Sequence, residues 1–107
     1  MQTELSERIL EYGVRTINVV ESLPKTLVGK RIGDQLLRSG TSVGANFEEA
    51  QAAERESNYW LRLLAKAGKL PKPRLAPLLD ESNQLVAMLS KAVAKVKGKA
   101  KPAIAAP

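Results

Sequence analysis

Four residues in the middle of this chain have side chains and a spacing that suit contact with a polyanion. They are Arg55, Tyr59, Arg62 and Lys66. They follow one another at intervals of four, three and four residues, so a helix would place them on one face. An aromatic ring can stack on a base while arginine and lysine contact phosphates. The alternative is a solvated helix face whose basic stems cover apolar surface, and the sequence favours that simpler interpretation.

The net charge of +6 is unevenly distributed along the 107 residues. Five lysines, at positions 91, 95, 97, 99 and 101, follow residue 90 with no acidic residue among them, so the rest of the chain is almost balanced. A basic tail attracts polyanions in a salt-sensitive and unspecific way and does not define a site. Three basic residues complete the set of nucleic-acid candidates: Arg38, Lys95 and Lys97.

The residue types that usually bind metals or carry out catalysis are scarce. Histidine and cysteine are absent, which excludes disulfides and metal ligation by imidazole or thiolate. Two adjacent acid pairs, at 48–49 and 80–81, are expected to lie on solvated helix faces, although Mg²⁺ binding by carboxylates alone stays open. The run from Ser39 to Gly44 lacks the lysine and the strand of a phosphate-binding loop. We therefore expect no catalytic residue, no metal, no cofactor and no small-molecule substrate.

Small residues between Ser39 and Ala45 would ordinarily indicate a loop, but they fall within an apolar repeat of helical period. Glycines at positions 40 and 44 would let a neighbouring helix approach closely. We therefore predict a helix with a smooth packing face, and Trp60 as a core or interface anchor. The predicted helix-packing residues are Gly40, Val43, Gly44, Phe47 and Trp60.

Composition and periodicity predict one small all-α domain. Ala, Glu, Lys, Leu and Arg supply about half of the residues, which is typical of long helices. We expect a bundle domain at 1–97, with its first helix at about 4–22 and its last at about 74–97. Residues 98–107 are expected to form a disordered basic tail. The buried stripe of the first helix is predicted to be Leu5, Ile9, Tyr12, Ile17 and Val20.

The sequence also bears on the cellular location. No apolar run approaches the roughly 20 residues of a membrane-spanning helix, so we expect no membrane contact. The first residues are amphipathic and too acidic for a signal peptide. A cytoplasmic protein is the simplest interpretation.

Three blocks of the sequence carry a resemblance to a known family. They are QLLRSGTSVGANFEEA at 35–50, YWLRLL at 59–64 and LLDE at 78–81. In this order they resemble the four-helix-bundle family of bacterial 23S rRNA intervening-sequence proteins, which includes the accessory variability determinants of diversity-generating retroelements. The resemblance implies a basic, ring-shaped homo-oligomer that engages RNA or DNA, or a reverse transcriptase.

The chain departs from the family pattern between residues 53 and 59. Relatives have a turn there and then a full third helix, whereas this chain has neither, and no Gly or Pro occurs between Phe47 and Gly68 to reverse its direction. We therefore predict that family helices two and three are fused into one helix from about 32 to 67, roughly 50 Å long. The result would be an up-down helical bundle of three long helices.

The predicted fused helix has consequences for packing and assembly. Its buried period places a polar pair in the middle of an apolar face, and it runs through Phe47, Ala50, Glu54, Ser57, Leu61 and Leu64. One chain would leave apolar surface around that helix uncovered, which is unfavourable at roughly 25 cal/mol per Å². A second, antiparallel copy could cover it, so we expect a homo-oligomer, most simply a dimer.

Two functional interpretations follow from the sequence. The first is a non-enzymatic, oligomeric helical-bundle protein that binds nucleic acid or a nucleic-acid enzyme. The second is a structural self-assembly or protein-interaction module, including a shortened family copy that has lost nucleic-acid binding.

Overall fold

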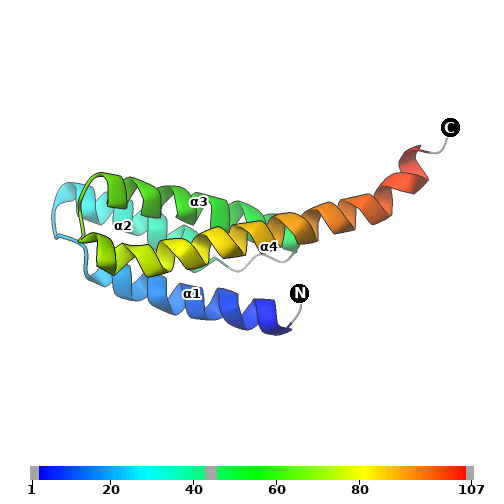
Figure 1. Cartoon of the computed structure of the whole chain (residues 1–107). Helices are drawn as coiled ribbons and strands as arrows, with labels where there is room; N and C mark the ends of the chain where they lie inside the picture. The colour runs from blue at the N-terminus through cyan, green and yellow to red at the C-terminus, as the bar shows by residue number, and fades with distance from the viewer. Residues whose placement is uncertain (1–2, 43–45, 106–107) are drawn as a thin grey trace.

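Four α-helices account for most of the chain in the computed structural model, which describes residues 3–42 and 46–105 (Figure 1). They are α1 (Thr3–Glu21), α2 (Leu27–Gly40), α3 (Phe47–Lys66) and α4 (Lys72–Ala105). No strand occurs within these residues. The all-α prediction is confirmed.

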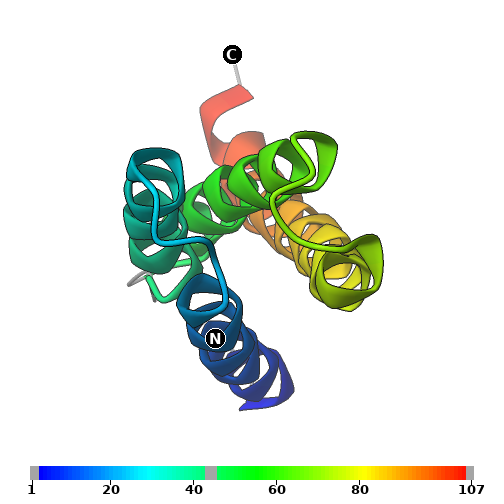
Figure 2. The same ribbon diagram turned by 90° about the vertical axis from the view of Figure 1, so that its left-hand side faces the viewer.

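The helices pack so that each one contacts two neighbours. α1 lies against α2 and α4, and α3 lies against the same two helices, so α1 and α3 occupy opposite corners (Figure 2). α4 has 34 residues and extends roughly 50 Å, which is far longer than the helices it packs against. Its C-terminal part therefore projects beyond the other three and gives the molecule extents of 57 × 26 × 21 Å (Figure 1).

The core consists mainly of leucine side chains that recur at helical spacing. On α3 the buried positions are those of the predicted period: Ala50, Glu54, Ser57, Leu61 and Leu64. On α4 they follow the same rule: Leu75, Leu78, Ser82, Leu85, Leu89 and Val93. Such a stripe on each helix is what drives four amphipathic helices together.

The predicted fusion of two helices is wrong. α2 ends at Gly40, and the chain reverses before α3 begins at Phe47. The backbone N–H of Thr41 donates to the carbonyl of Leu37 at 3.1 Å and closes α2. The side chain of Asn46 accepts a hydrogen bond from the backbone N–H of Glu49 at 2.9 Å and caps α3. Hydrogen-bonding caps thus override the apolar spacing that predicted a continuous helix.

The small residues act at the end of α2 rather than along a long helical face. A Cβ atom on Gly40 would lie 2.6 Å from Cγ2 of Thr16, so only glycine lets α2 approach α1 this closely. Val43 and Gly44, the other small-face predictions, lie outside the described residues. Phe47 and Trp60 are half-buried and pack against the leucine core.

The buried stripe of α1 differs from the prediction in its second half. Leu5, Ile9 and Tyr12 are buried as expected, but the stripe continues through Thr16 and Val19. Ile17 is 41% exposed, so its predicted burial is wrong. Thr16 can occupy a core position because its hydroxyl donates to the backbone carbonyl of Tyr12 at 2.8 Å.

The connection from α3 to α4 depends on one glycine. Gly68 has a φ of +68°, the left-handed conformation that commonly ends a helix, and α4 begins at Lys72. At its other end α4 continues to Ala105. It therefore runs as helix through most of the segment, 98–107, for which the sequence predicted a disordered tail.

Candidate nucleic-acid interface

The basic stripe, defined as Arg55, Tyr59, Arg62 and Lys66, lies on the solvent side of α3. All four residues are exposed, whereas the buried face of the helix points the other way through Leu61 and Leu64. Within the described part of the chain, none of the three cations forms an ion pair with a carboxylate. The structure therefore brings the four predicted residues together and leaves their charges available.

The stripe contains a shallow, open depression. Tyr59, Arg62, Leu63 and Lys66 line it, and its volume is about 230 Å³. The Tyr59 side chain is 55% exposed and meets the ring of Trp60 edge-on, with centroids 5.0 Å apart and planes at 74°. Because Trp60 is packed against the core, this contact supports the exposed tyrosine ring from behind. An exposed, supported aromatic ring beside two cations is suited to stacking on a base.

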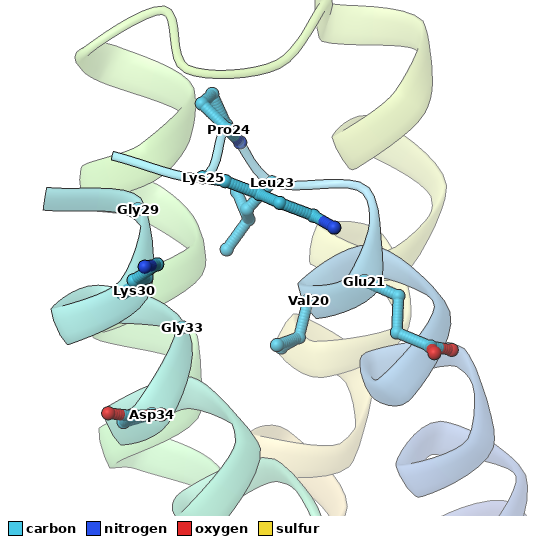
Figure 3. A pocket seen from close by; sticks show the side chains of 9 residues that line it. All are labelled: Val20, Glu21, Leu23, Pro24, Lys25, Gly29, Lys30, Gly33 and Asp34. Atoms are coloured by element: carbon cyan, nitrogen blue, oxygen red, sulfur yellow. The ribbon is translucent and has the colours of Figure 1, made fainter. Parts of the chain in front are cut away.

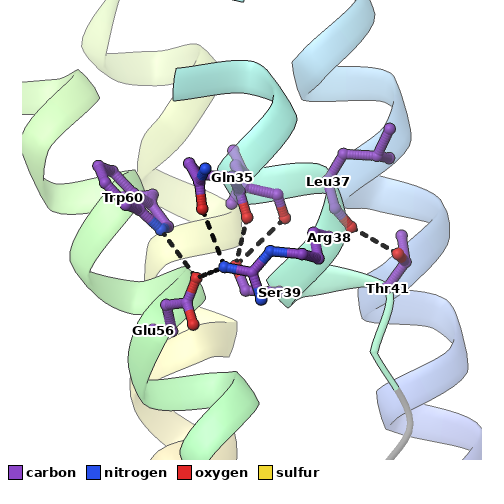
Figure 4. A network of polar contacts seen from close by, with 8 residues as sticks. Gln35, Leu37, Arg38, Ser39, Thr41, Glu56 and Trp60 are labelled. Atoms are coloured by element: carbon purple, nitrogen blue, oxygen red, sulfur yellow. Dashed lines mark hydrogen bonds and ion pairs between the residues drawn. The ribbon is translucent and has the colours of Figure 1, made fainter. Parts of the chain in front are cut away.

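Arg38 is not part of the stripe. Its guanidinium forms an ion pair with Glu56 and donates to Oε1 of Gln35 at 2.9 Å (Figure 4). The same Glu56 accepts a hydrogen bond from Nε1 of Trp60 at 3.3 Å. Arg38 therefore connects α2 to α3 on a different side of α3. Its predicted role in nucleic-acid contact has no support from this position.

The two lysine candidates on α4 also lie apart from the depression. Lys97 pairs with Glu48 at 3.1 Å, close to the start of α3. Lys66 lies at the other end of α3, roughly 27 Å away along the helix axis. Lys95 is exposed on the same part of α4 as Lys97. These lysines could extend a basic surface, but they do not build the depression.

Two cations near the stripe were missed in the sequence analysis. Lys69, in the connection after α3, and Lys72, the first residue of α4, are both exposed. The sequence contains a signal for them. The short Pro-rich segment at 69–73 follows directly on the helix that carries Lys66, and both lysines belong to that segment. They add two positive charges to the Lys66 end of the stripe.

A second depression lies at the α1–α2 turn and has a different character. Its volume is about 300 Å³, with Gly29 and Gly33 at its base. The charged residues around it are Glu21, Lys25, Lys30 and Asp34, from both helices and the turn (Figure 3). Two cations and two anions cancel, so this depression shows no preference for a charged ligand.

The structure offers no metal centre in the part of the chain that it describes. No group of three or more Asp, Glu, His or Cys side chains lies close enough to hold an ion there. The acid pairs noted in the sequence are divided between interactions with neighbouring helices: Glu48 contacts Lys97 and Glu81 contacts Arg8.

Comparison with known proteins adds no identification. No protein-family model matches the chain, and neither the curated proteins nor the solved structures contain a match. Family membership therefore stays a prediction that rests on the three sequence blocks. Among the described helices, none combines the length and the apolar character that crossing a membrane requires.

Proposed function

We propose that this protein is a non-enzymatic helical-bundle protein that binds nucleic acid through the basic stripe on α3. The observation that carries the proposal is the exposed Tyr59 ring, flanked by Arg62 and Lys66, whose charges are not used in ion pairs within the described chain. Stacking of one base on an aromatic side chain contributes roughly 1–3 kcal/mol. The neighbouring cations supply phosphate contacts and hence a binding energy that falls with salt.

The resemblance to the intervening-sequence family is a second line of support for the same proposal. It suggests RNA or DNA as the ligand and a reverse transcriptase as a protein partner. The cytoplasmic location expected from the sequence is part of the same proposal. An exposed ring can reach only bases that are unstacked, so single-stranded segments and loops are the ligands that fit this surface best.

Binding of a fluorescently labelled single-stranded RNA, followed by anisotropy over a range of salt concentrations, tests the proposal. Arg55→Gln, Arg62→Gln and Lys66→Gln together should weaken binding at least tenfold and reduce its salt dependence. Tyr59→Ala should weaken binding further, whereas Tyr59→Phe should retain it because the ring remains.

The matched control removes the same charge elsewhere. Lys25→Gln, Lys30→Gln and Arg31→Gln change three exposed cations around the α1–α2 turn and should leave binding almost unchanged. A chain that ends at residue 94, which keeps the buried Val93, provides a second control. Equal losses in both triple variants, or complete loss on removal of residues 95–107, would show that binding is general electrostatic attraction without a folded site.

A second candidate function, a self-assembly module, is favoured by an apolar surface on the other side of the molecule. Leu10, Val14 and Ile17 form an exposed stripe along α1 at intervals of four and three. Leu37 of α2 is also exposed and points toward α1 in Figure 4. Apolar side chains gathered in this way usually mark a contact surface. We propose that a second copy of the chain covers them, so that the protein is a homo-oligomer.

A further inference from the structure

A layer of polar side chains interrupts the leucine core between α1, α3 and α4. Its buried members are Tyr12, Glu54, Ser57 and Ser82. The hydroxyl oxygens of Tyr12 and Ser57 are 2.8 Å apart, and Ser57 donates to the backbone carbonyl of Glu54 at 3.0 Å. Ser82 accepts a hydrogen bond from the side chain of Asn58 at 3.0 Å, and the carboxyl group of Glu54 takes no part in this network.

Glu54 and its neighbour Glu81 differ in their exposure to solvent and in their hydrogen-bond partners. Glu54 is 1% exposed, and neither of its carboxyl oxygens has a hydrogen-bond partner among the described residues. Glu81 of α4 is partly exposed, and the guanidinium of Arg8 donates to its two oxygens at 2.6 and 3.0 Å. One carboxylate is neutralised by arginine, and the other is enclosed without a partner.

Enclosure favours the uncharged form of Glu54. Burial, and then the negative charge of Glu81, raise the pKa of the Glu54 carboxyl to about 8. Burial and the charge of Glu54 also raise the pKa of Tyr12, which faces the layer from α1, to about 12. Near neutral pH both groups are therefore mainly uncharged, as an apolar core requires.

Among the described residues, no cation pairs with Glu54. On α1, the guanidinium of Arg8 forms an ion pair with Glu81. The positive charge of Arg15 acts on the Tyr12 hydroxyl, whose pKa it lowers in part. On α2, Arg38 reaches α3, but it pairs there with Glu56 outside the core. An ionised carboxylate in this layer would lack both water and a counter-ion, which is a strongly unfavourable state.

Glu54 lies on α3, which packs against α4 along a seam between the two helices. Two sets of side-chain hydrogen bonds hold this seam on either side of Glu54 in the sequence. Gln51 donates to Ser90 at 2.9 Å, and Asn58 donates to Ser82 at 3.0 Å and to Asn83 at 2.8 Å. All three are partly exposed contacts between neutral groups, so their net contribution to stability is modest.

We propose that Glu54 is a proton-operated latch on the α3–α4 seam. With the carboxyl group protonated, the seam is closed and Glu54 remains in the core. When the carboxyl group ionises, it moves to water, the hydrogen bonds at Gln51 and Asn58 break, and α3 separates from α4 locally. This regulation is independent of nucleic-acid binding and survives if the proposed function is wrong.

The sign of the pH effect follows from proton binding. The unfolded chain loses the Glu54 proton near pH 4.5, whereas the folded chain keeps it up to about pH 8. Between these values the folded state holds one proton more, so each pH unit shifts the unfolding equilibrium about tenfold toward the unfolded state. The contribution of Glu54 is therefore most favourable below pH 4.5, declines toward pH 8 and is constant above it.

Thermal unfolding of the full-length chain from pH 4.5 to 9.5 tests this dependence. The midpoint of the wild-type chain should fall between pH 5 and 8, and that of Glu54→Gln should stay nearly flat relative to it. Glu54→Met, an apolar side chain of similar length, provides a second non-titrating variant. Glu11→Gln changes an exposed glutamate and should follow the wild type. Parallel curves for wild type and both Glu54 variants would overturn the proposal.

Thiol labelling tests whether the opening is local to the seam. The chain has no cysteine, so one introduced thiol reports on one position. At pH 9, Ser82→Cys should be labelled at least tenfold faster with Glu54 present than with Glu54→Gln, and equally fast in both at pH 6.5. Thr16→Cys, buried against α2, should stay protected in both. Equal labelling of Ser82→Cys in the two backgrounds, or exposure of Thr16→Cys together with Ser82→Cys, would refute a local latch.

Discussion

At the scale of single residues, the contact between Gly40 and Thr16 decides how closely α1 and α2 can approach. A Cβ atom at position 40 would lie 2.6 and 2.8 Å from Cγ2 and Oγ1 of Thr16. Gly40→Ala should therefore force the helices apart and lower the free energy of unfolding by about 1–3 kcal/mol. Gly40→Leu should cost more. Urea unfolding followed by circular dichroism measures the change.

Gly98 provides the comparison for this prediction. It also lies in a helix, but nothing is within 4 Å of the Cβ that alanine would add. Gly98→Ala should stabilise α4 slightly, because alanine favours a helix by roughly 1 kcal/mol over glycine. The same helix-propensity gain applies at position 40, so only a Gly40→Ala variant that is stabilised as much as Gly98→Ala would mean that α1 and α2 can separate without loss.

Which residues of a regular helix are buried could be predicted well from the sequence. The hydrogen-bond partners and ionisation of the buried polar groups could not. The period of α3 placed Glu54 and Ser57 on the buried face correctly, because helical spacing needs no knowledge of neighbours. The isolation of the Glu54 carboxyl could not be foreseen. It depends on Tyr12, Ser57 and Glu81, which come together only when three helices pack.

At the scale of the helices, the side chain of Asn46 fixes where α3 begins. It accepts a hydrogen bond from the backbone N–H of Glu49, and Glu48 and Glu49 in the first turn suit the helix dipole. Asn46→Ala should lower the free energy of unfolding by about 1 kcal/mol, whereas Asn46→Asp should retain the cap. Equal stability of the two variants, measured by thermal unfolding, would show that the cap contributes nothing.

The same cap explains the main error in the predicted architecture. Ile32, Leu36, Gly40 and Phe47 keep helical spacing across the reversal, so periodicity alone extended one helix through it. A polar Asn three residues before Glu49 is a helix-start signal that competes with that spacing. The four-helix count of the resembled family was the better guide, because each short helix here can bury its apolar face against two neighbours.

At the scale of the whole molecule, the outer surface of α1 and α2 carries several large exposed apolar side chains, and the proposed oligomer rests on them. Leu10 is 59% exposed and Ile17 41% exposed, although side chains of this kind gain roughly 1.5–3 kcal/mol each from full burial. The original reason for expecting an oligomer, a fused helix with uncovered faces, does not apply to four separate helices. The exposed stripe of Leu10, Val14 and Ile17 replaces it as the physical argument.

Self-association through this stripe should disappear when its side chains become polar. In sedimentation velocity at micromolar concentration, we expect the wild-type chain to form a homo-oligomer and the Leu10→Gln/Ile17→Gln variant to be a monomer. Both positions are exposed within one chain, so the variant should retain its helix content. Val96→Gln changes an equally exposed side chain on the distal part of α4 and should leave the oligomer intact. A wild-type monomer would contradict the prediction, and dissociation by Val96→Gln would move the interface to α4.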